Sequence, residues 1–280
     1  MNIVVAALVV VVASALAIGS LLFVRRRAPE GGYFNDSDRA AGIFGVLATA
    51  FFFLLGFIIF LAFASYDESR QGAETEALLV AQQFQTAQFM ASDTTVPLGG
   101  QLICYGRYVV EQEWPRMEDG SIGDELNPWG VAMFNELSDV EPQSASEESA
   151  FDKWFEQTSV REEARQDRLH GAEGIIPTPL WIVLILAAGL GIVFMHFFAD
   201  SGERAVVQAL QIGVVVALMV ATLLLIRFFD RPFESGIGGI EPVAMERTLN
   251  ILENELAGVG ERGELPCDDT GEPLDGGTDE

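Results

Sequence analysis

The sequence predicts an all-α membrane protein with four transmembrane helices and a helical domain outside the membrane between the second and third. Long uncharged stretches alternate with strongly charged ones, which indicates that the chain meets two solvents. The charged stretch at residues 67–173 is too long for a loop, and its apolar residues recur at helical spacing. It shows no alternating β pattern of useful length, so we expect helices there as well.

The first two spans are expected at residues 2–24 and 40–66. At about 1.5 Å per residue, each can cross a hydrocarbon core about 30 Å thick. A cleaved signal peptide is the alternative for the first, but its positive charge would precede the apolar run. Here Arg25, Arg26 and Arg27 follow the run, which favours an uncleaved span.

The third and fourth spans are expected at residues 178–199 and 205–228, joined by a short polar link as an antiparallel hairpin. Gln208 and Gln211 in the fourth span must face protein or water, because unpaired amides in hydrocarbon are costly. His196 near the end of the third span has two interpretations. It contributes to an ion or proton pathway, or it simply reaches the interface.

Residues 67–173 are expected to form a bundle of about four helices, two of which continue spans two and three out of the membrane. Asn127 and Pro128 are typical of a helix start. Ser144 and Glu147 resemble a capping box that opens a long helix towards His170.

The chain after the fourth span has two expected parts. Residues 229–256 are a membrane-proximal segment and helix. Residues 257–280 are rich in Gly, Pro, Asp and Glu, so we expect a disordered acidic tail.

The charge balance is strongly acidic, with 41 acidic against 16 basic residues and a net charge of −25. Such a surface repels nucleic acid, so no nucleic-acid partner is expected. Lys153 is the only lysine. A GC-rich genome and a salt-rich cytoplasm both favour few lysines, and the depth of acidity favours the second. We therefore expect a halophilic archaeon as the source.

No motif for catalysis, cofactor binding or metal binding is found in the sequence, so no enzyme, cofactor or metal site is expected. His170 and Glu173 sit just before the third span and either share a proton or form a solvated pair. Cys104 and Cys267 could pair in an oxidising space. A buried thiol and a tail thiol are the favoured interpretation.

Phe53 and Phe57 lie on one face of the second span, with Thr49 one turn earlier. A ring of such residues from several subunits would make an apolar constriction that gates by dewetting. Phenylalanines that face lipid are the alternative.

The segment from Phe53 to Phe57 resembles the second-span motif F-x-L-G-F of bestrophins. The resemblance implies that Thr49, Phe53 and Phe57 line a pore neck, although the family often has an aliphatic residue at the position of Thr49.

After the fourth span, the sequence from Asp230 to Glu234, which includes Pro232 and Phe233, resembles the bestrophin stretch E-D-P-F-G. Calcium binds near that stretch in some members. Here Arg231 replaces the second acid and Glu234 the glycine, and the downstream acidic cluster is reduced to Glu241. Bound calcium is therefore not expected.

Matches along nearly the whole chain resemble the bestrophin-like family of prokaryotic membrane proteins; they include 41–45, 65–67, 72–74, 113–115, 127–130 and 170–174. The resemblance implies a homo-oligomer, a pentamer if bestrophin-like, that passes inorganic ions through a pore lined by span two. It leaves anion or cation selectivity open.

The expected location is the cell membrane, crossed several times and in contact with lipid. The arginines at 25–27 and Arg39 favour an N-terminus outside. The larger basic count around the middle domain, and the resemblance, favour a cytoplasmic middle domain. The leading functional hypothesis is a passive ion channel. The alternative is a non-conducting membrane scaffold or sensor whose helical domain binds a protein partner.

Overall fold

The computed structural model describes residues 2–122, 127–258 and 265–274, apart from the side chains of residues 257 and 258. These residues form two compact units. The transmembrane unit comprises Met1–Ser65, Gly174–Asp230 and Ser235–Gly238. The helical domain comprises Tyr66–Glu173, Arg231–Glu234 and Gly239–Glu280. Within the described residues every named element is helical, which confirms the all-α membrane fold class.

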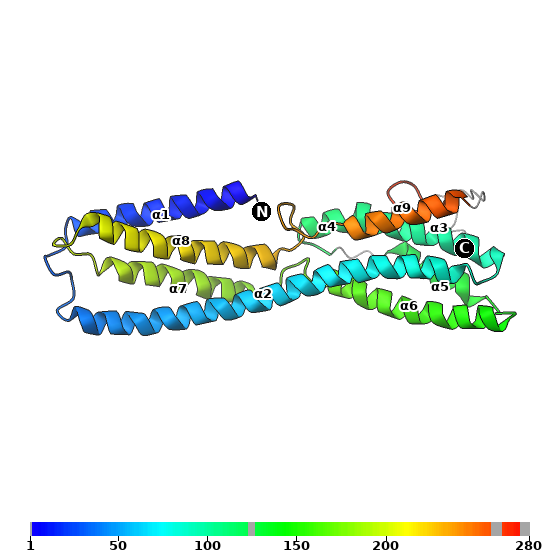
Figure 1. Ribbon diagram of the computed structural model, residues 1–280, viewed down its shortest axis with the longest axis horizontal. Helices are drawn as coiled ribbons and strands as arrows, with labels where there is room; N and C mark the ends of the chain where they lie inside the picture. Colours follow the sequence, from blue (N-terminus) through cyan, green and yellow to red (C-terminus); the bar gives the residue numbers. More distant parts are fainter. Residues whose placement is uncertain (1, 123–126, 259–264, 275–280) are drawn as a thin grey trace. The chain divides into compact units, whose positions relative to one another are not determined.

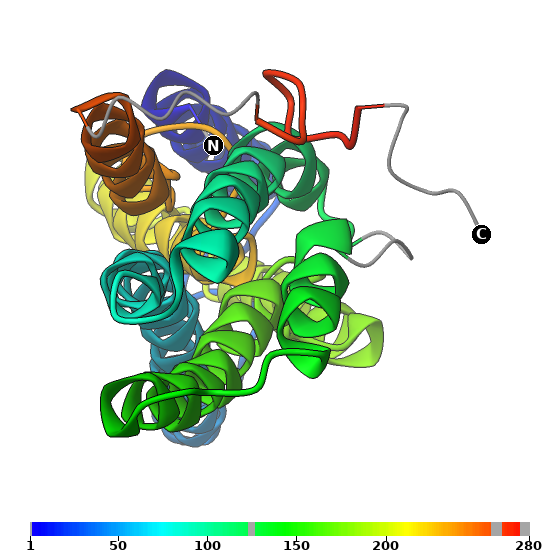
Figure 2. The ribbon, with the colours of Figure 1, turned by 90° about the vertical axis from the view of Figure 1, so that its right-hand side faces the viewer.

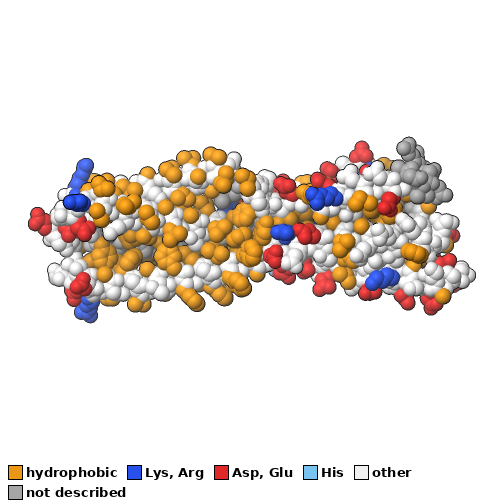
Figure 3. Space-filling model, viewed as in Figure 1, with side chains coloured by type: hydrophobic (Ala, Val, Ile, Leu, Met, Phe, Trp, Pro, Cys, Tyr) orange, Lys and Arg blue, Asp and Glu red, His pale blue; other side chains and the backbone are white. Residues whose placement is uncertain are grey.

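The transmembrane unit contains α1 (Ile3–Arg25), the first part of α2 (Ser37–Ala87), α7 (Thr178–His196) and α8 (Ala205–Asp230). Among the described residues these four helices are long and apolar enough to cross a membrane. Figure 1 shows α8 beside α1, and Figure 3 shows hydrophobic side chains covering the visible face of these helices.

Two small buried clusters hold the transmembrane unit together. One joins α1 to α8 through Leu21, Ile212 and Val216. The other joins α2 to α7 and α8 through residues that include Leu55 and Leu184. Most of the remaining apolar side chains of this unit are exposed, so they need lipid or neighbouring protein chains to cover them.

The helical domain has an extensive core. It contains the rest of α2, α3 (Ser92–Tyr108), a π-helical turn (Val109–Glu113), α4 (Trp114–Glu118), α5 (Pro128–Ser138), α6 (Ala145–His170) and α9 (Val243–Gly258). Figure 2 looks along this domain, in which α3 packs against α5 and α9. The buried aromatic side chains of Tyr105, Trp114 and Trp154 belong to one continuous cluster.

The helix starts in this domain follow the local sequence. The Asn127 side chain accepts a hydrogen bond from the Trp129 N–H, which caps α5. The Ser144 hydroxyl accepts from the Glu147 N–H, and the Glu147 carboxylate accepts from the Gln143 N–H, one residue before the usual partner in a capping box.

The expected continuation of span three into the domain is wrong. Whereas α2 runs unbroken from Ser37 to Ala87, α6 ends at His170 and α7 starts only at Thr178. Gly174 between them has φ +82°, a left-handed conformation that an α-helix does not tolerate. Pro177 then restricts the chain directly before α7 begins.

The C-terminal segment corrects two further expectations. Residues 265–274, which we name the clasp, are ordered around the Asp268 carboxylate, whose Oδ1 accepts from the N–H groups of Thr270 and Glu272. Residues 259–264 and 275–280 of the expected disordered tail lie outside the described residues. Cys267 forms a disulfide with Cys104 of α3, so two free thiols are not found. Pairing across 163 positions could not be inferred from spacing alone.

Candidate functional site

The outer face of α2 carries the residues expected to line a pore neck. Phe53 is 80% and Phe57 55% exposed, and Thr49 is exposed as well. The opposite face of this helix is buried through Leu55 and Ile58. Because residues seven and eleven positions apart return to nearly the same side of a helix, Val46, Phe53 and Phe57 form one uncovered apolar stripe.

Thr49 places a hydroxyl near this stripe, and the hydroxyl has a hydrogen-bond partner on its own helix. Its Oγ1 donates to the carbonyl oxygen of Gly45, 2.7 Å away and one turn earlier. A Cβ at Gly56 would meet no atom within 4 Å, so the helix surface beside Phe53 is open as well. The helix therefore offers a broad apolar surface with little polarity.

His196 is held by internal partners. Its Nδ1 lies 2.7 Å from the Ile192 carbonyl oxygen, which can only accept, so Nδ1 carries the proton in this hydrogen bond. Its Nε2 lies 2.8 Å from the Ser20 Oγ of α1. These contacts link α7 to α1.

Gln208 and Gln211 lie at the start of α8. The Gln208 amide donates to the carbonyl oxygen of Asp200 and to the Glu203 carboxylate, each at 3.1 Å. Both glutamines line a cavity of about 610 Å³ within the transmembrane unit, which Phe44 also borders. The amides thus face protein and a cavity, and Gln208 stabilises the short link between α7 and α8.

Asp230 at the end of α8 anchors the segment that leads into α7. One carboxylate oxygen accepts from the N–H groups of Ile175 and Ile176 at 2.9 and 2.8 Å. The other accepts from the Trp181 indole N–H at 3.2 Å. With three donors satisfied inside the protein, this carboxylate has a structural role.

The rest of the post-span motif belongs to the helical domain. Phe233 is buried and packs edge-on against Trp114, with ring centroids 5.5 Å apart. The Pro232 carbonyl oxygen accepts from the Ile240 N–H, and Glu234 is half-buried. The motif therefore acts mainly as a packing element of this domain.

His170 and Glu173 are both exposed. Within the described part of the chain, no hydrogen bond or ion pair joins their side chains. The solvated pair is therefore the interpretation that fits their placement. They belong to the helical domain, whereas His196 belongs to the transmembrane unit, where its partners are Ser20 and Ile192.

A buried charge network in the helical domain was missed by the sequence reasoning. The Arg168 guanidinium donates to Glu76 at 2.5 and 3.0 Å and to Glu113 at 2.5 Å. Arg165 donates to the other oxygen of Glu113 at 2.8 Å, and the Tyr105 hydroxyl donates to Glu76 at 2.6 Å. Arg168 and Glu76 are 0% exposed. One signal was available, because Glu76 lies among small apolar residues on the buried face of α2.

The network shifts the pKa values of its members. Burial works against ionisation of Glu113, but Arg168 and Arg165 outweigh it and lower the pKa of this carboxyl. Burial, together with the Glu76 charge, raises the pKa of the Tyr105 hydroxyl well above its ordinary value. Burial opposes the charge of Arg168, yet Glu76 and Glu113 raise its pKa. Glu113 is therefore anionic and Arg168 cationic at neutral pH.

Among the described residues no group of three or more His, Cys, Asp or Glu side chains is placed to hold a metal ion. Glu76 and Glu113 already accept hydrogen bonds from arginines and a tyrosine, and Asp230 accepts from N–H donors. Two features remain as candidates for a functional role. One is the uncovered apolar stripe in the transmembrane unit, and the other is the buried charge network in the helical domain.

Comparison with known proteins agrees with this architecture. A bestrophin-like domain family matches residues 10–245. A crystal structure of a bacterial bestrophin homologue from Klebsiella pneumoniae is similar, with a TM-score of 0.65, 14% identity, and coverage of 94% of this chain and 100% of that one. A point variant of a bacterial bestrophin homologue from the same organism gives a TM-score of 0.63 at 14% identity, with the same coverage. No curated protein matches the sequence. Since the family match spans most of the chain, this protein belongs to the bestrophin-like family.

Proposed function

We propose that the protein is a homo-oligomeric passive ion channel of the cell membrane, with α2 lining the pore. The observation that carries the proposal is the uncovered stripe that contains Phe53 and Phe57 on α2. An apolar ring built from this stripe would exclude water when narrow and admit hydrated ions when wide. Conduction through it requires no chemical step and no cofactor.

An oligomer is part of the proposal because one chain cannot enclose a pore with a single helix face. Closed rings are the usual form of such head-to-tail assemblies. Family membership supports a pentamer for this chain. In that ring Thr49, Phe53 and Phe57 from each subunit would face the axis, and other exposed apolar side chains would contact neighbours or lipid.

The charge of the chain bears on which ions pass. A net charge of −25 per subunit would make a vestibule negative and enrich cations within it. Salt near 1 M shortens the screening length to about 3 Å, so this enrichment weakens in concentrated salt. We propose cation preference at low salt, in a protein whose acidity adapts it to a salt-rich environment.

Purified protein in planar lipid bilayers tests the proposal. We expect single-channel currents, and we expect Phe57→Ala to enlarge the conductance or prolong the open state because it widens the apolar constriction. Phe23→Ala is the matched control, since Phe23 on α1 is 56% exposed and Phe57 55%. Silent bilayers, or equal effects of the two variants, would contradict the proposal. A silent monomer or dimer that binds a soluble protein would instead indicate a scaffold or sensor.

A further inference from the structure

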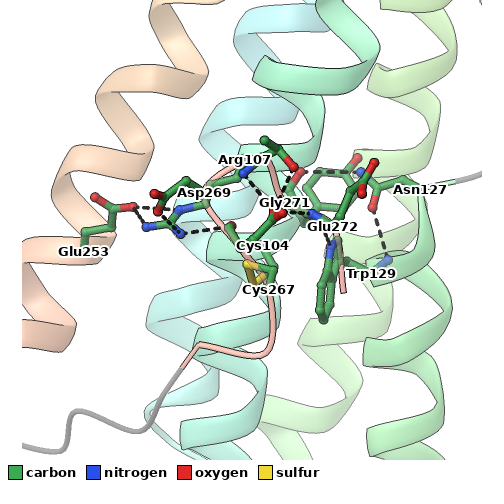
Figure 4. The surroundings of a disulfide bond; sticks show 12 residues. Cys104, Arg107, Asn127, Trp129, Glu253, Cys267, Asp269, Gly271 and Glu272 are labelled. Carbon is green, nitrogen blue, oxygen red and sulfur yellow. Dashed lines mark hydrogen bonds and ion pairs between the residues drawn. A yellow bond between two sulfur atoms is a disulfide. The ribbon is translucent and has the colours of Figure 1, made fainter. Parts of the chain in front are cut away.

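The Cys104–Cys267 disulfide is buried and surrounded by hydrogen bonds that hold the clasp in place (Figure 4). Cys104 of α3 is 0% exposed, and its Cα lies 5.8 Å from that of Cys267 in the clasp, within the range disulfides require. The Trp129 indole N–H donates to the Gly271 carbonyl oxygen at 2.7 Å. Arg107 donates to the Asp268 carbonyl oxygen at 3.2 Å and to the Glu253 carboxylate at 2.8 Å. The first two contacts hold the clasp against α5 and α3 independently of the sulfur–sulfur bond, and the third joins α3 to α9.

The close approach at Gly271 shows that the clasp is fitted to this place. Its φ is +78°, and a Cβ there would lie 2.3 Å from the Tyr108 backbone nitrogen. A side chain at this position would clash with the α3 backbone, so glycine allows the clasp to lie this close to α3. The chain has two cysteines, so its whole thiol content is committed to this bond.

Disulfides of this kind persist in oxidising compartments and are rare in the reducing cytosol. The chain order also decides which parts share a compartment. The helical domain follows two spans and the clasp follows four, so both lie on the side of the N-terminus. The short links between α1 and α2, and between α7 and α8, lie on the other side.

We infer that the helical domain and the clasp face the outside of the cell, with the two short links in the cytoplasm. This orientation is the reverse of the one implied by the resemblance to bestrophins. It goes beyond the proposed channel function and does not depend on it, since a non-conducting membrane protein would carry the same compartment signal.

The arginines support the same orientation once their surroundings are known. Arg26, Arg27 and Arg204 are exposed on the two short links, and Arg39 is exposed in the first turn of α2 on the same side. Excess positive charge marks the cytoplasmic side.

Arg70, Arg227 and Arg231 lie on the other side near the span ends, but the three arginines that precede the third span carry less weight. Arg161 and Arg168 are buried inside the helical domain, and Arg165 is paired with Glu113. The domain segment, residues 66–173, also exceeds the roughly 60-residue limit beyond which loops translocate largely regardless of charge.

The orientation determines what can reach each part of the protein. A soluble ligand or protein that acts on the helical domain must come from outside the cell. A cytoplasmic signal can reach only the short links and the helix ends that they join.

Cysteine accessibility in intact cells tests the orientation. Ser149→Cys on α6 and Ser201→Cys on the link between α7 and α8 are matched variants, since both serines are exposed. The native cysteines stay in place because a disulfide does not react with maleimide. A membrane-impermeant polyethylene-glycol maleimide should shift the gel band of Ser149→Cys in intact cells, and that of Ser201→Cys only after permeabilisation. The reverse pattern would overturn the inference.

A second measurement needs no variant. Cells are quenched in acid, and the thiols of the wild-type protein are alkylated in denaturant before and after reduction. We expect no alkylated thiol before reduction and two after it. Two free thiols in the unreduced sample would place the pair in a reducing compartment and overturn the inference.

Discussion

Replacing Arg168 by Met tests whether the charge network holds the helical domain together. Arg168 is 0% exposed, as is Glu76, and Glu113 is 3% exposed. Among the residues that the structure describes, the variant would leave Glu76 with only the Tyr105 hydroxyl as a side-chain partner, whereas Glu113 would keep Arg165. Removing one partner of a buried ion pair costs about 3–5 kcal/mol, because an uncompensated charge remains. Met is flexible enough to fill most of the vacated space, so the cost is expected to be mainly electrostatic.

The free energy of unfolding can be measured by urea titration of the full-length protein in detergent. Three of the four tryptophans, Trp114, Trp129 and Trp154, lie in the helical domain, so tryptophan fluorescence reports mainly on this domain. Arg70→Met is the control, because Arg70 forms an exposed pair with Glu74 and should change stability little.

A double variant isolates the unpaired charge. Adding Glu76→Gln to Arg168→Met removes the stranded carboxylate, so the double variant should be more stable than Arg168→Met alone. If Arg168→Met costs no more than Arg70→Met, or if the two changes in the double variant simply add, the network does not act as described.

Three further predictions concern packing, pH and salt. Gly72→Ala should destabilise the helical domain by about 1–3 kcal/mol, because its Cβ would lie 2.6 Å from the Ala164 carbonyl oxygen. Gly189→Ala is the control and should leave stability unchanged, because a Cβ there would meet nothing within 4 Å. Equal urea midpoints of the two variants would refute the prediction for Gly72. The pKa of Glu113 is lower in the folded protein than its ordinary value of 4.5, so its contribution to the free energy of unfolding is complete above pH 4.5 and is lost as pH falls through the folded pKa. Glu113→Gln should therefore make the fall in stability at acidic pH less steep. A steeper or unchanged fall would count against it. Raising KCl to about 1 M should raise the urea midpoint by screening acidic repulsion, and a falling midpoint would contradict this.

The spans could be predicted from the sequence because hydrocarbon imposes a simple rule on length and charge. The helix starts in the helical domain were also predictable, because Asn127 and Ser144 satisfy backbone donors only a few residues away. The break between α6 and α7 was missed because the left-handed conformation of Gly174 cannot be read from composition, although Pro177 was a signal that a helix would not continue there.

The contacts between residues far apart in the chain could not be predicted from the sequence for a different reason. The partners of Glu76 lie at positions 105 and 168, and their mutual approach depends on how three helices pack. The clasp looked disordered by composition, since Gly, Pro and acidic residues predominate. Its order comes from a disulfide and from contacts with α3 and α5 that no local pattern encodes. The role of Phe53 and Phe57 remains a prediction.

The most direct test of the channel account is modification of α2 during current recording. Phe57→Cys should react with a charged methanethiosulfonate reagent added from the aqueous phase, and the current should change irreversibly as charge enters the constriction. The native cysteines form a disulfide and do not react. Phe23→Cys on α1 should leave the current unchanged under the same reagent. Equal responses of the two variants, or an unmodified Phe57→Cys current, would contradict a pore lined by α2.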